Sequence, residues 1–207
     1  CACLVGSEMC KETARIVSPQ FSNPLHHHAY FFDQASQSLY IFGGYGNYQY
    51  SNLTYQYDFD HGAWKEIQFT GDVIYPRMHT VAGKGPVEGS FFVFGGVGNE
   101  TGKQELGKDF FCDLYLFDTS KHIVKKLWSR AFPDNYFIPT RGLVFDSKKE
   151  CIYLLCIDRK TTNASLHRFD VKTGEHAIVS NEIVFQTNCI LSVSYTHLRA
   201  HETCADL

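Results

Sequence analysis

The hydrophobic positions of the chain fall into short runs that end at glycine, and one such run occurs twice. Residues 39–47 (LYIFGGYGN) are matched position for position by residues 91–99 (FFVFGGVGN), 52 residues further along the chain. Four apolar residues followed by two glycines and a Gly-Asn turn signal are typical of a buried β-strand and disfavour a helix. A period near 50 residues indicates a repeated structural unit.

The repeat extends on both sides of this strand. Upstream, residues 28–32 lie opposite residues 79–82 at an offset of 51, and downstream, residues 52–58 lie opposite residues 112–118 at an offset of 60. The second unit therefore carries about eight additional residues after its glycines. A third, weaker copy has lost the glycine pair, and it comprises residues 142–145, 151–156 and 165–170.

The pattern of each unit predicts short β-strands joined by turns. The first two units have four strands each, and the last strand is residues 64–67 in the first unit and residues 124–127 in the second. No segment long enough for a helix shows a 3.6-residue period. The strand before the glycines is apolar on both faces, because Tyr40 and Phe42 lie on one face and Leu39 and Ile41 on the other. A strand that hides both faces needs protein above and below it, which stacked four-stranded sheets provide.

The glycine pair and two aromatic positions relate these units to a known family. Gly43-Gly44, Tyr57 and Trp64 match in full the pattern of kelch-repeat β-propellers, in which a diglycine follows strand two and a Tyr or Phe precedes a Trp by six or seven residues. The other units match in part: Gly95-Gly96 and Phe117 are followed by Val124 in place of the Trp, and the third unit keeps Phe169-Asp170. Roughly residues 24–185 thus resemble a kelch-repeat protein such as the central domain of galactose oxidase. The resemblance implies an all-β fold, a partial kelch-type β-propeller of about three four-stranded antiparallel blades.

The repeat boundaries divide the chain into five parts. We expect kelch blades at residues 24–76 and 77–140 and a degenerate blade at residues 141–191, preceded in residues 1–23 by the end of another blade or domain. Residues 193–207 resemble a translated sequencing adaptor, so residues 192–207 are interpreted as an artefactual tail. Propellers close with about four to eight blades. We therefore expect a fragment whose neighbouring blades are missing.

Composition and charge exclude several kinds of partner. The net charge is −3 at pH 7 and no basic stripe accompanies the aromatic residues, so nucleic-acid binding through this segment is not expected. No apolar run approaches the roughly 18 residues needed for a membrane span. The eight cysteines lack paired CxxC spacing, and Cys151 and Cys156 are expected to be buried on opposite faces of one strand. Cys3 and Cys10 would form a disulfide only in an oxidising compartment. The sequence leaves the location open and slightly favours an extracytoplasmic one.

His26, His27 and His28 form the most conspicuous group of potential metal ligands. Adjacent residues on an extended strand point to opposite faces, so only His26 and His28 could share an ion, and another ligand would have to come from a different blade. We interpret the three histidines as a polar start of strand one. Neither a metal nor any other cofactor is expected.

The long loops indicate which end of the blades carries function. In a four-stranded antiparallel blade, the loop between strands two and three and the loop leading to the next blade emerge at the same end. Those loops are the long ones here, and functional residues tend to lie on long loops held by a rigid scaffold. The candidate ligand-binding residues at this end are Tyr45, Asn47, Tyr48, Tyr50, Arg77 and Arg141. Tyrosine rings and an amide suit a peptide or a sugar, and the two arginines, each near a proline, would clamp a carboxylate.

Two classes of function are compatible with these residues. The first is a kelch-repeat binding or sensing module that recognises a protein or glycan-derived ligand within a larger multidomain protein, such as a bacterial sensor or regulator. The alternative is a carbohydrate-active enzyme, because the kelch family includes galactose oxidase and a sialic acid mutarotase. An enzyme needs convergent acid and base groups or a metal, and the sequence contains no such constellation, so we favour the binding module and assign no catalytic residue.

Overall fold

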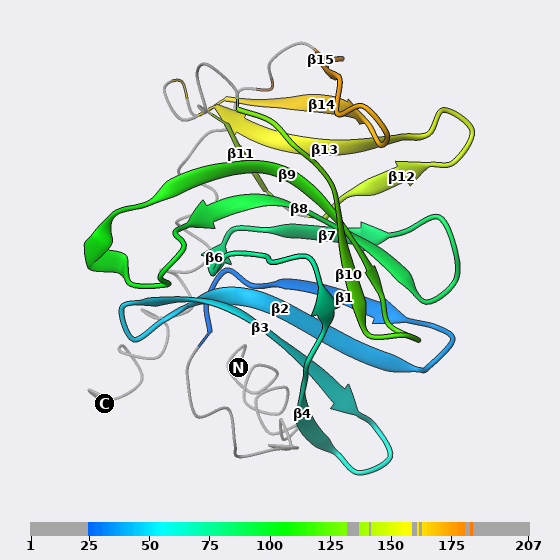
Figure 1. Ribbon diagram of the computed structural model, residues 1–207. Helices are drawn as coiled ribbons and strands as arrows, with labels where there is room; N and C mark the ends of the chain where they lie inside the picture. Colours follow the sequence, from blue (N-terminus) through cyan, green and yellow to red (C-terminus); the bar gives the residue numbers. More distant parts are fainter. Residues whose placement is uncertain are drawn as a thin grey trace, which may run out of the picture.

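A computed structural model describes residues 25–131, 137–140, 142–158, 161, 163–180 and 183, and these residues form an all-β structure of three antiparallel sheets (Figure 1). The first sheet has the order β1-β2-β3-β4. Its strands are β1 (Ala29–Asp33), β2 (Ser38–Gly46), β3 (Gln49–Asp58) and β4 (Ala63–Ile67). All four predicted strands of the first repeat are therefore present and pair in sequence order.

The second sheet repeats this order and gains two short strands. Its main strands are β7 (Val81–Lys84), β8 (Ser90–Gly98), β9 (Asp109–Asp118) and β10 (Ile123–Ser129). β5 (Thr70–Gly71) runs parallel to β10, and β6 (Arg77–Met78) pairs with the far end of β8. A short 3-10 turn, η1 (Gln104–Leu106), lies in the connection between β8 and β9.

The third sheet follows the same plan with shorter outer strands. It contains β11 (Phe137–Pro139), β12 (Val144–Asp146), β13 (Cys151–Asp158), β14 (Ala164–Asp170) and β15 (His176–Ile178). β11 and β12 both pair with β13, as β6 and β7 both pair with β8. The first and third sheets lie on opposite sides of the second, so the described residues do not close a ring (Figure 1).

Aromatic side chains fill the two seams between the sheets. In the first seam, the Phe31 ring stacks on Phe91 at 4.2 Å between centroids. In the second, Phe94 packs against Phe169 at 4.9 Å, and the indole N–H of Trp128 donates to the carbonyl of Val171 at 3.0 Å. Every residue of β8 is buried, which confirms that strand two is hidden on both faces.

The diglycines form β-bulges within strand two. The register shifts between Phe42 and Gly44 in the first sheet and between Phe94 and Gly96 in the second, and all four glycines have positive φ. A Cβ at Gly43 would lie 2.8 Å from the carbonyl oxygen of Arg77, so two backbone segments approach each other closely at this bulge. The expectation that the glycines end the strand was wrong, because β2 and β8 each continue for two residues beyond them.

The structure corrects the alignment of strand one. Ala29 pairs with Phe42 and Val81 with Phe94, so the offset between the first two sheets is 52 in strand one as it is in strand two, and His79 is equivalent to His27 rather than His28. His27 and His79 both have a φ of 56°. Each stands two residues before the equivalent strand-one residues Ala29 and Val81. The first two repeats therefore share a left-handed residue that turns the chain into the sheet.

The third repeat keeps more of the pattern than its sequence indicates. Tyr57 pairs with Trp64 across β3 and β4, and their rings lie 5.1 Å apart. At the same register in the third sheet Phe169 pairs with His176, whose ring stacks on it at 4.6 Å. His176 thus occupies the position of the kelch Trp, a substitution that the sequence pattern missed.

Candidate functional site

The loop end of the first sheet is a tight hairpin. β2 and β3 are joined by Asn47 and Tyr48, whose φ values are 50° and 61°. Two consecutive left-handed residues are the geometry of a type I′ turn, whose twist matches that of antiparallel strands. The turn places the Tyr48 side chain at the tip, where it is 81% exposed.

The corresponding connection of the second sheet is longer and is organised by Asn99. The buried Asn99 side chain donates to the carbonyl oxygens of Lys103 and Gly107, at 2.7 Å each, and accepts from the Thr101 amide and hydroxyl. These bonds fold residues 99–108 back on themselves around one amide. Leu106 projects from this loop with 63% of its surface exposed.

The two connections are bonded to each other. The Tyr50 amide donates to the carbonyl of Gly102 at 2.7 Å, and the Gln104 amide donates to the carbonyl of Tyr48 at 3.2 Å. The Tyr45 hydroxyl donates to the Gln104 side-chain oxygen. The hairpin tip and the long loop therefore form one hydrogen-bonded surface, which we call the loop-end surface: residues 45–50 and 99–108.

The structure gives the predicted tyrosines different environments. Tyr45 is half-buried and bonded to Gln104, while Tyr50 is 6% exposed and packs on Tyr45 with ring centroids 5.6 Å apart. Burial, and then the neighbouring Tyr45, raises the pKa of Tyr50. Asn47 and Tyr48 are exposed. Of the three rings that the sequence places together, only that of Tyr48 is fully presented to a partner.

Arg77 does not reach the exposed surface. It is 1% exposed, and its Nη1 lies 2.7 Å from Asp113 Oδ1 and 3.2 Å from the carbonyl of Gly95. Nε donates to the carbonyl of Tyr75 at 2.9 Å, and the guanidinium lies 3.9 Å from the centre of the Phe111 ring. The arginine instead ties the start of the second sheet to β8 and β9. The other predicted arginine, Arg141, lies outside the described residues.

The side chains of His26, His27 and His28 have different surroundings. His26 exchanges backbone hydrogen bonds with Tyr45, and His28 Nδ1 lies 3.2 Å from the carbonyl of Leu25. His27 packs on His79 with ring centroids 4.1 Å apart. Burial, followed by His27, lowers the pKa of His79 to about 4. Among the described residues, no group of three or more His, Cys, Asp or Glu side chains is placed to hold a metal ion.

The cysteines that the structure describes are buried free thiols. They are Cys112, Cys151 and Cys156. Burial raises the pKa of Cys112 and of Cys156 far above the ordinary value, so neither is a thiolate at neutral pH. Cys3 and Cys10 lie outside the described residues.

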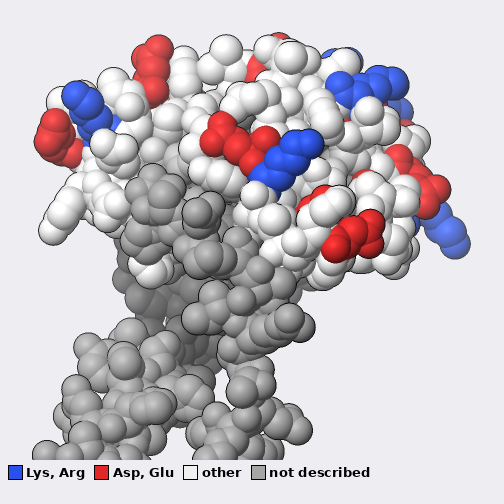
Figure 2. Space-filling view, turned by 90° about the horizontal axis from the view of Figure 1, so that it is seen from below, with Lys and Arg blue, Asp and Glu red and all other residues white. Residues whose placement is uncertain are grey.

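Surface charges of both signs are interspersed over the described part of the chain. Figure 2 shows Lys and Arg side chains beside Asp and Glu on the face seen from below, with white surface between them. Lys172 and Glu150 form an exposed ion pair, with Nζ and Oε2 2.6 Å apart. Within the described residues, no helix is long and apolar enough to cross a membrane.

Three stacked antiparallel sheets, each with the same strand order and two with diglycine bulges, define a kelch-type β-propeller domain. The family model described as the KLHDC2/KLHL20/DRC7 Kelch-repeats domain matches residues 8–189, and the chain belongs to this family. A comparison with curated proteins gives no match. Kelch-repeat domains typically bind proteins.

Proposed function

We propose that this domain is a protein-binding module whose loop-end surface carries the contact. The observation that supports the proposal is the 81% exposed ring of Tyr48 on a hairpin tip whose backbone is held by Gln104 and Gly102. Exposed Tyr side chains are common anchors of protein interfaces. A backbone that is already fixed lowers the entropy lost on binding, so this tip is suited to act as a preorganised anchor.

Leu106 adds a second exposed apolar side chain to the loop-end surface. Gln104 is bonded to Tyr48 through the backbone, and Leu106 follows two residues later with most of its side chain exposed. Glu100, Lys103, Glu105 and Lys108 are exposed around it on the same loop. An apolar centre within a rim of mixed charge is the usual composition of a protein interface.

A protein partner fits this surface better than a glycan. A sugar site of the kind expected from the sequence would use the rings of Tyr45, Tyr48 and Tyr50 together. The structure buries Tyr50 and engages the Tyr45 hydroxyl, so one flat ring and an aliphatic side chain remain as the main contacts. In a larger protein, recognition at this surface would serve a sensing module that passes the signal to another domain.

Selection of a displayed peptide library on the full chain tests the proposal. Selected peptides are then measured against the double variant Tyr48→Ser/Leu106→Ser and against Ile178→Ser. Ile178 lies on β15, outside the loop-end surface, and its exposed fraction of 60% is close to the 63% of Leu106. Loss of an aromatic and an aliphatic anchor should weaken binding at least about tenfold in the double variant.

The control should bind as the parent chain does, and circular dichroism should show that all three proteins are equally folded. If the selected peptides bind the double variant as tightly as the parent chain, the loop-end surface is not the contact and the proposal is wrong.

A further inference from the structure

Two contacting histidines join the first two sheets. His27 precedes β1 and His79 precedes β7, and their rings lie 4.1 Å apart between centroids. The His79 amide also donates to the carbonyl of His27 at 2.9 Å. We call His27 and His79 the histidine pair. Because its members belong to different sheets, the pair connects the two sides of the first seam where β1 and β7 begin.

The histidine pair lies where both halves of the loop-end surface are anchored. On the side of the first sheet, His26 exchanges backbone hydrogen bonds with Tyr45, the first residue of the hairpin half. On the side of the second sheet, Met78 pairs with Val97, two residues before the long loop. The residues next to the pair therefore hold the hairpin and the loop that bond to each other in the loop-end surface.

The surroundings of the pair oppose its protonation. Burial is the largest cause that lowers the pKa of His27, followed by His26 and His28. Burial, followed by His27, lowers the pKa of His79 to about 4. Among the described residues, no carboxylate contributes to either shift. An added proton therefore meets other imidazoles in place of a counter-charge.

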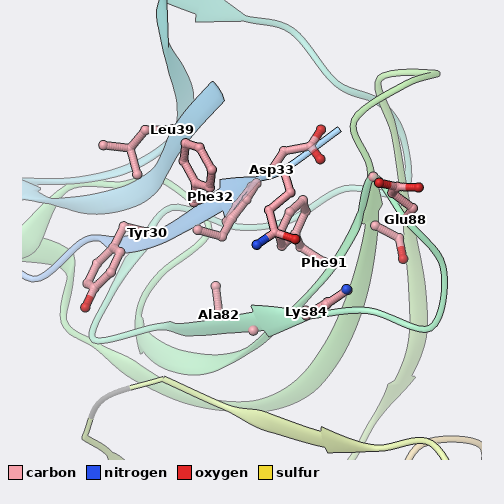
Figure 3. Close-up of a pocket in the computed structure, with 13 residues that line it drawn as sticks. Tyr30, Phe32, Asp33, Leu39, Ala82, Lys84, Glu88 and Phe91 are labelled. Atoms are coloured by element: carbon pink, nitrogen blue, oxygen red, sulfur yellow. The ribbon is translucent and has the colours of Figure 1, made fainter. Parts of the chain in front are cut away.

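The other charged groups around the first seam are of types that do not respond to moderate acid. The buried Arg77 guanidinium is paired with Asp113 at 2.7 Å. At the far ends of β1 and β7, a pocket of about 460 Å³ is lined in part by Asp33, Lys84 and Glu88 (Figure 3). Aspartate, glutamate, lysine and arginine side chains ordinarily keep their charge between pH 7 and pH 5. The histidine pair is therefore the part of this seam that such a change of pH affects.

We propose that the histidine pair is a pH-sensitive switch, which keeps the two halves of the loop-end surface together at neutral pH and lets them separate in moderate acid. Protonation favours the separated arrangement because water solvates both imidazolium groups there, whereas the closed arrangement partly buries them side by side. Acid should thereby release a partner from the loop-end surface, and in this respect the inference rests on the function proposed above.

The pKa of His79 sets the size of the effect. An exposed imidazole has an ordinary pKa near 6.5, whereas the pKa of His79 in the closed arrangement is about 4. The closed arrangement is therefore fully favoured above about pH 6.5 and is progressively disfavoured as the pH falls towards 4. Between pH 7 and pH 5, the equilibrium constant for opening should rise about 20-fold through His79 alone.

Hydrogen exchange of the full chain, followed by mass spectrometry, tests the switch without any ligand. Peptides that cover residues 45–50 and 99–108 contain the Tyr50 and Gln104 amides, which bond across the loop-end surface. After correction for the intrinsic exchange rate at each pH, their opening should increase about 20-fold from pH 7 to pH 5. At both pH values they should exchange faster than the amides of β8 and β9, because the opening is local.

Matched variants separate the histidine pair from general effects of acid. His79→Asn, which tolerates positive φ, should remove most of the change between pH 7 and pH 5. His27→Asn should only reduce the change, because burial is the larger cause of the low His79 pKa. His167 is a buried histidine of the third sheet whose pKa is also lowered to about 4. His167→Tyr should leave the change at the loop-end surface intact.

Three results would overturn the proposal: a change below about threefold in the parent chain, the full change retained in His79→Asn, or the change lost in His167→Tyr. A selected peptide that lacks His, Asp and Glu should bind the parent chain more weakly at pH 5 than at pH 7, and His79→Asn should remove this difference. Equal binding at both pH values would refute the release of a partner. Failure to select any peptide would count against the loop-end contact alone, since the exchange measurement does not depend on it.

Discussion

Replacing Arg77 with Met tests whether this arginine stabilises the fold rather than binds a ligand. The side chain is fully enclosed and bonds Asp113 and the carbonyl oxygens of Gly95 and Tyr75. Arg77→Met keeps most of the aliphatic length but leaves the buried Asp113 carboxylate without its cation. Removing one member of a buried ion pair costs about 3–5 kcal/mol. We expect a loss in the free energy of unfolding of that size.

A double-mutant cycle separates the pair from its surroundings. Asp113→Asn alone leaves the buried guanidinium without a counter-charge and should cost about 3 kcal/mol. The double variant Arg77→Met/Asp113→Asn contains no uncompensated buried charge, so its loss should fall short of the sum of the single losses by about 2 kcal/mol. Urea unfolding at pH 7, followed by the fluorescence of Trp64 and Trp128, measures all four proteins.

An exposed ion pair of similar length serves as the control. Lys172 Nζ lies 2.6 Å from Glu150 Oε2, but both side chains are more than half exposed. Lys172→Met should therefore leave the free energy of unfolding nearly unchanged. Additive losses in the cycle, or a loss below about 1 kcal/mol for Arg77→Met, would refute the structural role of the buried pair.

Three further predictions concern the bulges, the stacked histidines and the buried thiols. Gly96→Ala should destabilise the fold by about 3 kcal/mol, because φ is 114° and the new Cβ would lie 2.7 Å from the Met78 carbonyl; Gly107→Ala, at positive φ but in open space, should cost about 1 kcal/mol. Because the pKa of His79 is lowered to about 4, this residue alone should lower the free energy of unfolding by about 2–3 kcal/mol as the pH drops from about 6.5 to 4, since the unfolded chain takes up the proton first. The pKa of His167 is lowered to about 4 as well, so His79→Asn, which tolerates positive φ, should remove only the His79 contribution to the pH dependence of chemical unfolding. Cys112 and Cys156 should react with a thiol reagent only as fast as the protein unfolds; rapid labelling of the folded chain would contradict their burial.

The sequence pattern predicted the sheets because each main strand carries its own signal. The apolar runs of β2 and β8 and the diglycines after them are visible without any structure, and all four strands of the first repeat were expected. β5, β6 and β11 could not be predicted in this way, since segments of two or three residues have no measurable periodicity. The one-residue error at strand one arose because three consecutive histidines offer three equivalent matches to His79.

The candidate site was only partly accessible to sequence reasoning. Adjacency along the chain brought Tyr45, Tyr48 and Tyr50 together, but it could not show which ring the hairpin exposes. Arg77 beside a proline looks the same in sequence whether it faces solvent or Asp113, because the partner lies 36 residues away. Leu106 was missed because one aliphatic residue in a polar loop carries no pattern; the unusual length of residues 97–111 was the available signal.

The position of the diglycine bulges gives the fold a way to vary its recognition surface without altering its core. In both sheets the bulge is followed by two more paired residues and then by the connection to strand three. The first connection is a two-residue turn and the second spans residues 99–108, yet the paired residues before each bulge keep the same register in the two sheets. Insertions at this end are thus absorbed beyond the bulge. A library that randomises residues 99–108 in length and sequence, while retaining the buried amide of Asn99, should yield folded variants with new binding specificities.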